Sequence, residues 1–217
     1  MHSQEDIRFV EPLYTLPQVG QFLGVPRSML VHWYPFLQHI DTPRHHDPTI
    51  TFIGLAEAYL LFALHRARIP FPRIHSAVEV RTAPLAGKHA LASHRIYSET
   101  ATFFEQWNHS PCFIPYSHPS AFREALHESE RLIVWGKDDY PLRLYLPTYH
   151  PTKVLIDPEH AFGQPIFAST GTKVDDVLER FWAGDPLQSI ALDYGLDASD
   201  VEEALRVASR QGSRLMA

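Results

Sequence analysis

The chain has 217 residues, of which 45% are hydrophobic and 20% charged, the balance of an ordinary globular protein with one or two domains. A single cysteine, Cys112, excludes an intramolecular disulfide and a thiolate cluster for zinc. No apolar run reaches the roughly 18 residues of a membrane span, and no secretory leader opens the sequence. We therefore expect a cytoplasmic protein that spans no membrane.

The net charge of −6 is unevenly distributed along the chain. Residues 1–100 hold nine Arg/Lys against eight Asp/Glu, whereas residues 101–217 hold ten against seventeen. Any contact with DNA would therefore belong to the N-terminal half and rest on few cations. Because the affinity of one protomer would be modest, we expect a homodimer on a two-fold site.

The clearest pattern lies in residues 14–34, which predict two short helices. Thr15 can cap the first helix, and the Gly24-Val25-Pro26 turn can end it. The apolar positions recur at helical spacing, and they are Leu16, Val19, Phe22, Leu23, Met29, Leu30 and Trp33. Such a unit is typical of a helix-turn-helix whose second helix lies in the major groove of double-stranded DNA, although the pair could also serve packing alone. The outward positions of the second helix are Arg27, Ser28, Val31 and His32.

Residues 36–53 predict a small hairpin, or wing. Turn residues gather at 41–48, and residues 50–53 are β-branched or aromatic. The tip of a wing can touch phosphate or the minor groove, so Arg44 is a candidate DNA contact and His45 a second. The adjacent histidines at this tip could instead suggest a metal site. Since no third ligand stands at a recognisable spacing, we expect no metal.

Two helices are predicted at 54–68 and 71–81, separated by a proline-rich break. Arg66, Arg68 and Arg73 gather at this junction. They could contact DNA phosphates or only solvate helix ends, and the sequence favours neither interpretation. We take Arg66 and Arg68 as candidate DNA contacts.

Residues 83–160 have a different character, with short runs of β formers separated by turns. The expected strands lie at 95–97, 102–104, 132–135, 143–146 and 153–157, and a helix is expected at 120–129. The segment has no glycine-rich phosphate loop, no G-x-S-x-G motif and no paired nucleophile and base, so it predicts no enzyme. We expect it to bridge and to dimerise, or to receive a partner strand at an exposed edge.

Residues 161–217 predict three helices with clear ends. Thr172 is expected to cap the first, Pro186 to open the second, and Gly195 to separate it from the third. The chain as a whole is predicted to be mostly α with a small α+β middle of short antiparallel strands. The predicted domains are residues 1–82, 83–160 and 161–217.

Two stretches resemble known families. Residues 14–34, closed by Trp33-Tyr34, look like the N-terminus of MerR-type regulators, which implies a winged helix-turn-helix. The C-terminal helices are similar to domain-of-unknown-function family 433, which implies a three-helix homeodomain-like unit. This second resemblance rests on Gly163-Gln164-Pro165, Thr170-Gly171-Thr172, Gly184-Asp185-Pro186 and Asp193-Tyr194-Gly195-Leu196.

Together, the two stretches make the chain resemble a VapB-type antitoxin of the longer kind. The resemblance implies two activities: neutralising a PIN-domain ribonuclease toxin encoded beside it, and repressing the shared operon. A stand-alone MerR-like regulator, with an effector-binding C-terminal half, is the alternative. A metal-dependent enzyme using the fourteen histidines is a third interpretation, but no metal-ligand motif supports it, and we expect no cofactor.

The C-terminal unit is acidic where a DNA reader would be basic. The acids around its third helix are Asp197, Asp200, Glu202 and Glu203. Because these side chains would oppose phosphate, we expect the unit to contact protein, either a second protomer or the toxin. The resemblance implies a toxin with a metal-holding carboxylate cluster. Arg210 and Arg214, in a tail expected to be flexible, are the candidates to pair with those carboxylates.

Overall fold

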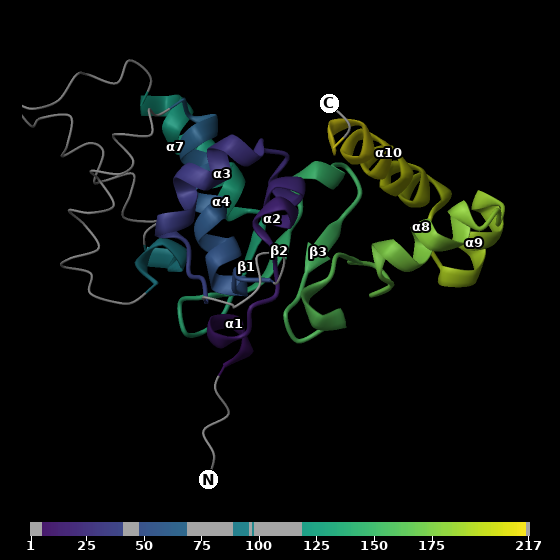
Figure 1. Ribbon diagram of the computed structural model, residues 1–217, viewed down its shortest axis with the longest axis horizontal. Coiled ribbons are helices and arrows are strands. Elements are labelled where there is room, and N and C mark those ends of the chain that lie inside the picture. The colour runs from purple at the N-terminus through teal and green to yellow at the C-terminus, as the bar shows by residue number, and fades with distance from the viewer. Residues whose placement is uncertain (1–5, 41–47, 69–88, 96, 98–118, 216–217) are drawn as a thin grey trace, which may run out of the picture.

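The computed structural model describes residues 6–40, 48–68, 89–95, 97 and 119–215. Several predictions lie outside these ranges, namely the wing residues Arg44 and His45, the helix at 71–81 and the strand at 102–104. Within them, a helical N-terminal half, a four-stranded antiparallel sheet and three C-terminal helices follow one another (Figure 1). The prediction of a mostly helical chain with a small antiparallel middle is confirmed.

Both helices of the predicted helix-turn-helix are present. α2 spans Leu16–Leu23 and α3 spans Arg27–Trp33. Thr15 caps α2 as expected: its hydroxyl accepts from the Gln18 N–H, while the Gln18 side chain accepts from the Thr15 N–H. Gly24 ends α2 with a φ of 69°, a left-handed conformation that costs glycine little.

α4 (Phe52–Arg66) is the central helix of the N-terminal half. The strand expected over residues 50–53 is wrong beyond Ile50. Thr51 instead caps α4, since its hydroxyl accepts from the Gly54 N–H at 3.1 Å. The neighbouring short helices are α1 (Ile7–Val10), η1 (Tyr34–Phe36) and η2 (Ala90–Ala92).

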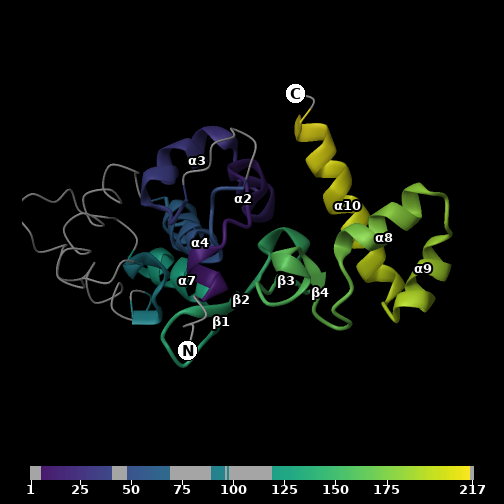
Figure 2. The ribbon, with the colours of Figure 1, turned by 60° about the horizontal axis from the view of Figure 1, so that its bottom comes forward.

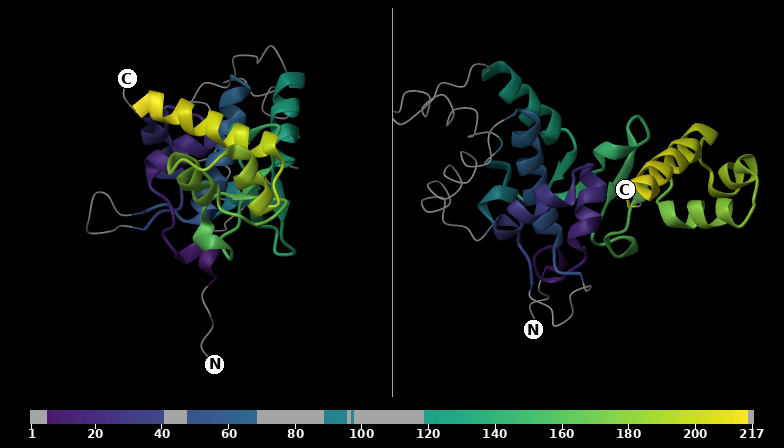
Figure 3. Two further views of the ribbon diagram at one scale, coloured as in Figure 1. Left: turned by 90° about the vertical axis from the view of Figure 1, so that its right-hand side faces the viewer. Right: turned by 45° about the horizontal axis from the view of Figure 1, so that its top comes forward.

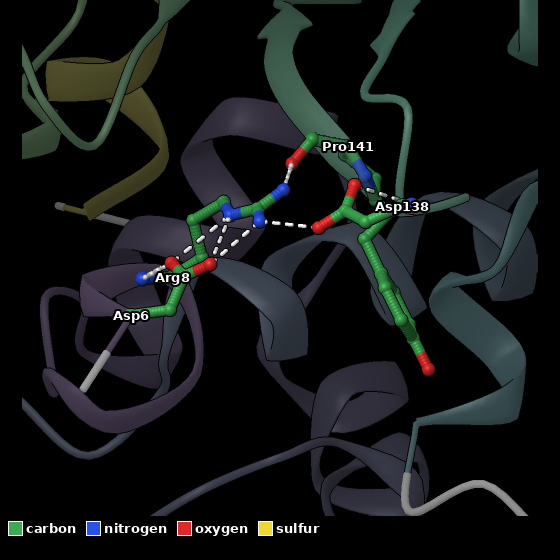
Figure 4. Close-up of polar contacts among 5 residues, drawn as sticks. Asp6, Arg8, Asp138 and Pro141 are labelled. Atoms are coloured by element: carbon green, nitrogen blue, oxygen red, sulfur yellow. Dashed lines mark hydrogen bonds and ion pairs between the residues drawn. The ribbon is translucent and has the colours of Figure 1, made fainter. Parts of the chain in front are cut away.

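The N-terminal helix α1 is fastened to the sheet by one arginine. The Arg8 guanidinium donates to the carboxylates of Asp6 and Asp138 and to the carbonyl oxygen of Pro141 (Figure 4). Asp138 and Pro141 belong to the turn and the start of the second strand. The contact therefore joins the beginning of the chain to its middle.

The sheet is an antiparallel meander paired in chain order. Its strands are β1 (Ile133–Trp135), β2 (Pro141–Tyr145), β3 (Val154–Ile156) and β4 (Ile166–Phe167), preceded by α7 (Pro119–Glu130). The strands expected at 132–135, 143–146 and 153–157 and the helix at 120–129 are confirmed. β4 was not predicted, and its pairing with β3 carries the sheet past residue 160.

The strand expected at 95–97 is wrong. Residues 94, 95 and 97 are helical, although Arg95 and Tyr97 stand in a run of β formers. Tyr97 is 5% exposed and packs edge-on against Trp135 of β1, with 5.4 Å between ring centroids. Packing under the sheet therefore overrides the local β propensity.

The C-terminal helices are α8 (Val174–Trp182), α9 (Leu187–Tyr194) and α10 (Ala198–Leu215), preceded by the short turn η4 (Ala161–Gly163). Gly195 ends α9 as expected. Thr172 does not cap α8, because its hydroxyl accepts from Thr170 instead and Lys173 takes the cap position. The tail expected to be flexible from residue 210 is helical as far as Leu215.

The turn η3 (Pro147–Tyr149) lies between the two helical parts of the molecule (Figures 2 and 3). The Thr148 hydroxyl donates to the carbonyl oxygen of Phe22, near the end of α2, at 3.2 Å. The Thr152 hydroxyl donates to Asp200 of α10 at 2.8 Å. The turn and the three residues after it therefore contact both the helix-turn-helix and the C-terminal unit. No helix within the described residues is long and apolar enough to cross a membrane.

Gly54→Ala should destabilise the protein, although alanine normally favours a helix interior by about 1 kcal/mol over glycine. A Cβ at this position would overlap the carbonyl oxygen of Gln38 and crowd Ile50. We expect a loss of about 1–3 kcal/mol in the free energy of unfolding, measured by urea denaturation. Gln188→Ala, an exposed change in α9, is the control. A Gly54→Ala protein as stable as wild type would contradict this close approach.

Candidate functional site

α3 presents a polar face to solvent. Arg27, Ser28 and His32 are exposed, and Val31 between them is 55% exposed. These positions follow helical spacing, so they share one face. The His32 Nδ1 atom lies 2.7 Å from the carbonyl oxygen of Ser28, one turn earlier. The structure therefore brings together the three DNA-binding residues predicted on this helix.

The opposite face of α3 is packed against two other helices. Leu30 and Trp33 are 0% and 1% exposed. A Cβ at Gly20 of α2 would lie 2.8 Å from the Leu30 side chain, so α2 and α3 are in close contact. Trp33 meets His65 of α4 with 6.4 Å between ring centroids. The buried face of α3 therefore packs against α2 and α4.

The chain on either side of the predicted wing tip runs antiparallel. The Ile40 N–H donates to the carbonyl oxygen of Thr49 at 2.8 Å. Ile50 forms isolated antiparallel bridges with His39 and with Tyr14, just before α2. The described arms thus run in the directions that a hairpin requires. The tip residues Arg44 and His45 lie outside the described residues.

A carboxyl group is buried beneath this region. Glu57 of α4 is 4% exposed, accepts a hydrogen bond from the Gln38 N–H, and lies 3.9 Å from the Nδ1 atom of His89. Burial raises the pKa of Glu57 to about 8, because it penalises the charged form more than the hydrogen bond from Gln38 favours it. Burial in the folded protein therefore favours the neutral, protonated form of Glu57.

The two arginines predicted at the end of α4 differ in their surroundings. Arg66 pairs with Glu128 of α7 at 3.1 Å, and both side chains are about half exposed. Arg68 lies beyond the helix end, exposed, with a left-handed φ of 58°. Both follow His65, which contacts Trp33, so they lie near the C-terminal end of α3.

The predicted toxin-binding arginines lie on the last turns of α10. The Arg210 guanidinium is 3.3 Å from a carboxylate oxygen of Glu203. Glu203 is 7% exposed and also pairs with Arg206, at 3.2 Å. Arg214 lies one turn beyond Arg210 on the same helix, and its side chain lies outside the described part of the structure. Arg210 is therefore already paired with a buried acid.

Only two of the four acidic residues predicted to repel DNA at the third C-terminal helix are exposed to solvent. Asp197 and Glu202 are exposed. Asp200 accepts a hydrogen bond from Thr152, and Glu203 faces inward. The exposed surface near α10 is therefore less acidic than its sequence, because the exposed Arg206 and Arg210 stand beside the exposed Asp197 and Glu202.

Three large apolar side chains on α8 and α9 are exposed, and none of them was predicted as a functional residue. Phe181 of α8 is 38% exposed. Trp182 is 67% exposed, and Leu192 of α9 is 82% exposed. No local pattern marks them, because the adjacent large apolar residues Val177 and Leu178 of the same helix are both buried.

Two of the described histidines pair with the same acid, Glu130. His94 pairs with Glu130 at 3.1 Å, and His127 approaches the same carboxylate at 3.6 Å. In the part of the chain that the structure describes, no group of three His, Cys, Asp or Glu is placed to hold a metal ion.

Comparison with known proteins identifies the family. A protein of Mycobacterium tuberculosis named "Putative antitoxin VapB45" is 30% identical to this chain, over 92% of this chain and 95% of its own length. The chain belongs to the VapB45 family. The crystal structure of Rv2018 from M. tuberculosis matches this VapB45-family chain with a TM-score of 0.79 and 31% identity, covering 91% of this chain and 99% of the other.

Two family models match parts of this VapB45-family chain. One, described as "Putative DNA-binding HTH domain", matches residues 29–78, which include most of α3 and all of α4. The other, described as "Protein of unknown function (DUF433)", matches residues 154–208, from β3 into α10. The resemblances to family 433 and to a long VapB-type antitoxin are thus confirmed.

Glu57→Gln should change how stability depends on pH. Because folding raises this pKa from 4.5 to about 8, the stability that the neutral acid contributes is full below 4.5 and is lost as the pH rises through about 8. Relative to Glu57→Gln, wild type should lose up to about 1.4 kcal/mol of unfolding free energy per pH unit inside this window. Urea titrations below, within and above the window measure this. A difference that does not vary with pH would contradict the burial of a titrating acid.

Proposed function

We propose that this VapB45-family protein is the antitoxin of a type II toxin–antitoxin pair. It binds and neutralises a PIN-domain ribonuclease encoded beside it, and as a homodimer it represses the shared operon by binding double-stranded DNA. The observation that carries the proposal is the exposed polar face of α3, a helix most of which lies within residues 29–78, the stretch that matches a family described as "Putative DNA-binding HTH domain". Neither the relative nor the matched families are described as enzymes, which favours a regulatory protein.

In this proposal α3 supplies the side chains that enter the major groove. Arg27 can form paired hydrogen bonds with a guanine or contact a phosphate. Ser28 and His32 add hydrogen bonds from the same face. Since α3 rests on α2 and α4, its polar face is already in place before DNA arrives.

An outer set of contacts would come from the wing and from the end of α4. Arg44 and His45 at the wing tip are proposed to touch the DNA backbone, as are Arg66 and Arg68. Arg66 would exchange Glu128 for a phosphate, and the cost is small because an exposed ion pair contributes little. The set is small for DNA binding, which favours a homodimer that reads two half-sites.

Arg210 and Arg214 are proposed to bind the toxin. Each would pair with a carboxylate that otherwise holds the metal ion of the nuclease. Arg210 would have to leave Glu203, but that buried acid keeps Arg206 at 3.2 Å and is not left unpaired. In this proposal, the homeodomain-like helices α8–α10 bind protein rather than DNA. Their partner is the toxin or a second protomer.

The double variant Arg27→Ala/His32→Ala should lose binding to the promoter DNA of its own gene. Each such contact is worth about 1–3 kcal/mol, so affinity should fall by roughly 100-fold. Fluorescence anisotropy at several salt concentrations measures this, and the salt dependence should become shallower. Arg206→Ala, which removes an exposed arginine from α10, should bind as wild type does. Unchanged affinity of the double variant would remove α3 as the DNA reader.

Arg210→Ala/Arg214→Ala should weaken toxin neutralisation and leave DNA binding intact. Losing charge-assisted hydrogen bonds worth about 1.5–3 kcal/mol each should raise the antitoxin concentration needed to inhibit the ribonuclease at least tenfold. Arg131→Ala is the matched control, because it removes an exposed arginine that lies outside the C-terminal helices. Full neutralisation by the double variant would rule out insertion of these arginines.

A further inference from the structure

α8 and α9 hold large apolar side chains out of the core. Trp182, Leu192 and Phe181 are 67%, 82% and 38% exposed, whereas Val177 and Ile190 of the same helices are fully buried. The two helices pack against each other and against α10 through those buried residues. Folding therefore leaves three large apolar side chains uncovered on neighbouring helices, which is typical of a surface that binds another molecule.

The same helices are acidic. Asp175 and Glu179 of α8 are exposed, and no described cation forms an ion pair with either. Lys173, just before α8, pairs instead with Asp176 at 3.0 Å. We call Phe181, Trp182 and Leu192, together with Asp175 and Glu179, the α8–α9 surface.

Arg180, the one cation in α8 and α9, is neutralised and holds the two helices together. It donates to Asp185 at 2.7 Å, before α9 begins, and to Asp193 at 2.8 Å, near the end of α9. Its guanidinium also lies over the ring of Tyr194, 5.5 Å from the centroid. Arg180 thus joins α8 to α9 through Asp185 and Asp193, and Asp175 and Glu179 keep their negative charge without a described ion-pair partner.

We propose that the α8–α9 surface binds the RNA-binding face of the ribonuclease toxin. A ribonuclease must attract a polyanion, so its substrate face is basic and offers groups on which bases can stack. Asp175 and Glu179 present carboxylates to that face as RNA presents phosphates, and Trp182 presents a flat ring as RNA presents a base. This inference rests on the proposed function, because it assigns the surface through which that toxin is bound.

Other occupants fit this surface less well. In a symmetric contact with a second copy of the chain, Asp175 and Glu179 of one copy would face Asp175 and Glu179 of the other. Like charges across an interface repel. A nucleic acid would meet the same repulsion. A basic protein surface is the partner that both the charge and the exposed apolar rings favour.

The α8–α9 surface and Arg210 would meet different parts of the toxin. A nuclease that uses a metal ion has carboxylates at its centre and a basic groove around them. The C-terminal unit offers the opposite sign at each place, with arginine on α10 and acid on α8. The two contacts are separable by mutation.

The test uses the full-length protein and the PIN-domain ribonuclease encoded beside its gene. Trp182→Ala/Leu192→Ser removes apolar contacts, and Asp175→Asn/Glu179→Gln removes charge; all four side chains are exposed, so thermal unfolding should not change. Phe162→Ser is the matched control, because Phe162 is 85% exposed on η4. Each double variant should weaken toxin binding by roughly 10-fold or more, whereas the control should not. All should bind promoter DNA as wild type does.

Competition with RNA gives a second measurement. Wild-type protein should displace a single-stranded RNA oligonucleotide from catalytically inactive toxin, and the charge variant should show a shallower salt dependence of binding. If the variants bind as tightly as wild type, or if RNA stays bound in a ternary complex, the assignment is overturned while the antitoxin function stands. Disruption of a homodimer without loss of toxin binding would assign the surface to a second copy instead. If wild type does not bind the toxin, the proposed function fails and this assignment with it.

Discussion

The enclosure of α4 determines where the other N-terminal elements lie. Twelve of its 15 residues are buried, with α1, α2, η2, α7 and β2 packed around it. The Tyr59 hydroxyl donates to the carbonyl oxygen of Tyr145 at 2.7 Å, which joins the helix to β2. A helix enclosed in this way cannot shift without its neighbours. Trp33 of α3 contacts His65 of α4, so the position of α4 determines the position of the polar face of α3.

Elements whose ends are set by local chemistry could be predicted from the sequence. Thr15 and Gly24 marked the ends of α2 because a cap and a left-handed glycine act within one turn of chain. The start of α4 was misread because residues 50–53 have β propensity, whereas the Thr51 cap and burial on every side favour the helix. β4 has two residues and takes its partner from β3, so no local pattern could reveal it.

Some residues of the candidate site could likewise be predicted from the sequence, and others could not. Arg27, Ser28 and His32 could be placed on one face because helical spacing alone determines it. The pairing of Arg66 with Glu128 joins α4 to α7 and could not be read from either segment. The exposure of Trp182 was beyond prediction for another reason: a tryptophan next to a buried stripe is ordinarily expected to pack inside.

The turn η3 has a consequence for how two binding events would influence each other. Thr148 of η3 donates to the carbonyl oxygen of Phe22 in α2, and Thr152, three residues after η3, donates to Asp200 of α10. A partner that displaced α10 would strain the same support on which α2 rests. Thermodynamic linkage would then make the coupling reciprocal. If bound toxin changed the affinity for operator DNA by some factor, bound DNA would change the affinity for toxin by the same factor. Under the proposed function, transcription of the operon would thereby depend on the balance between antitoxin and toxin.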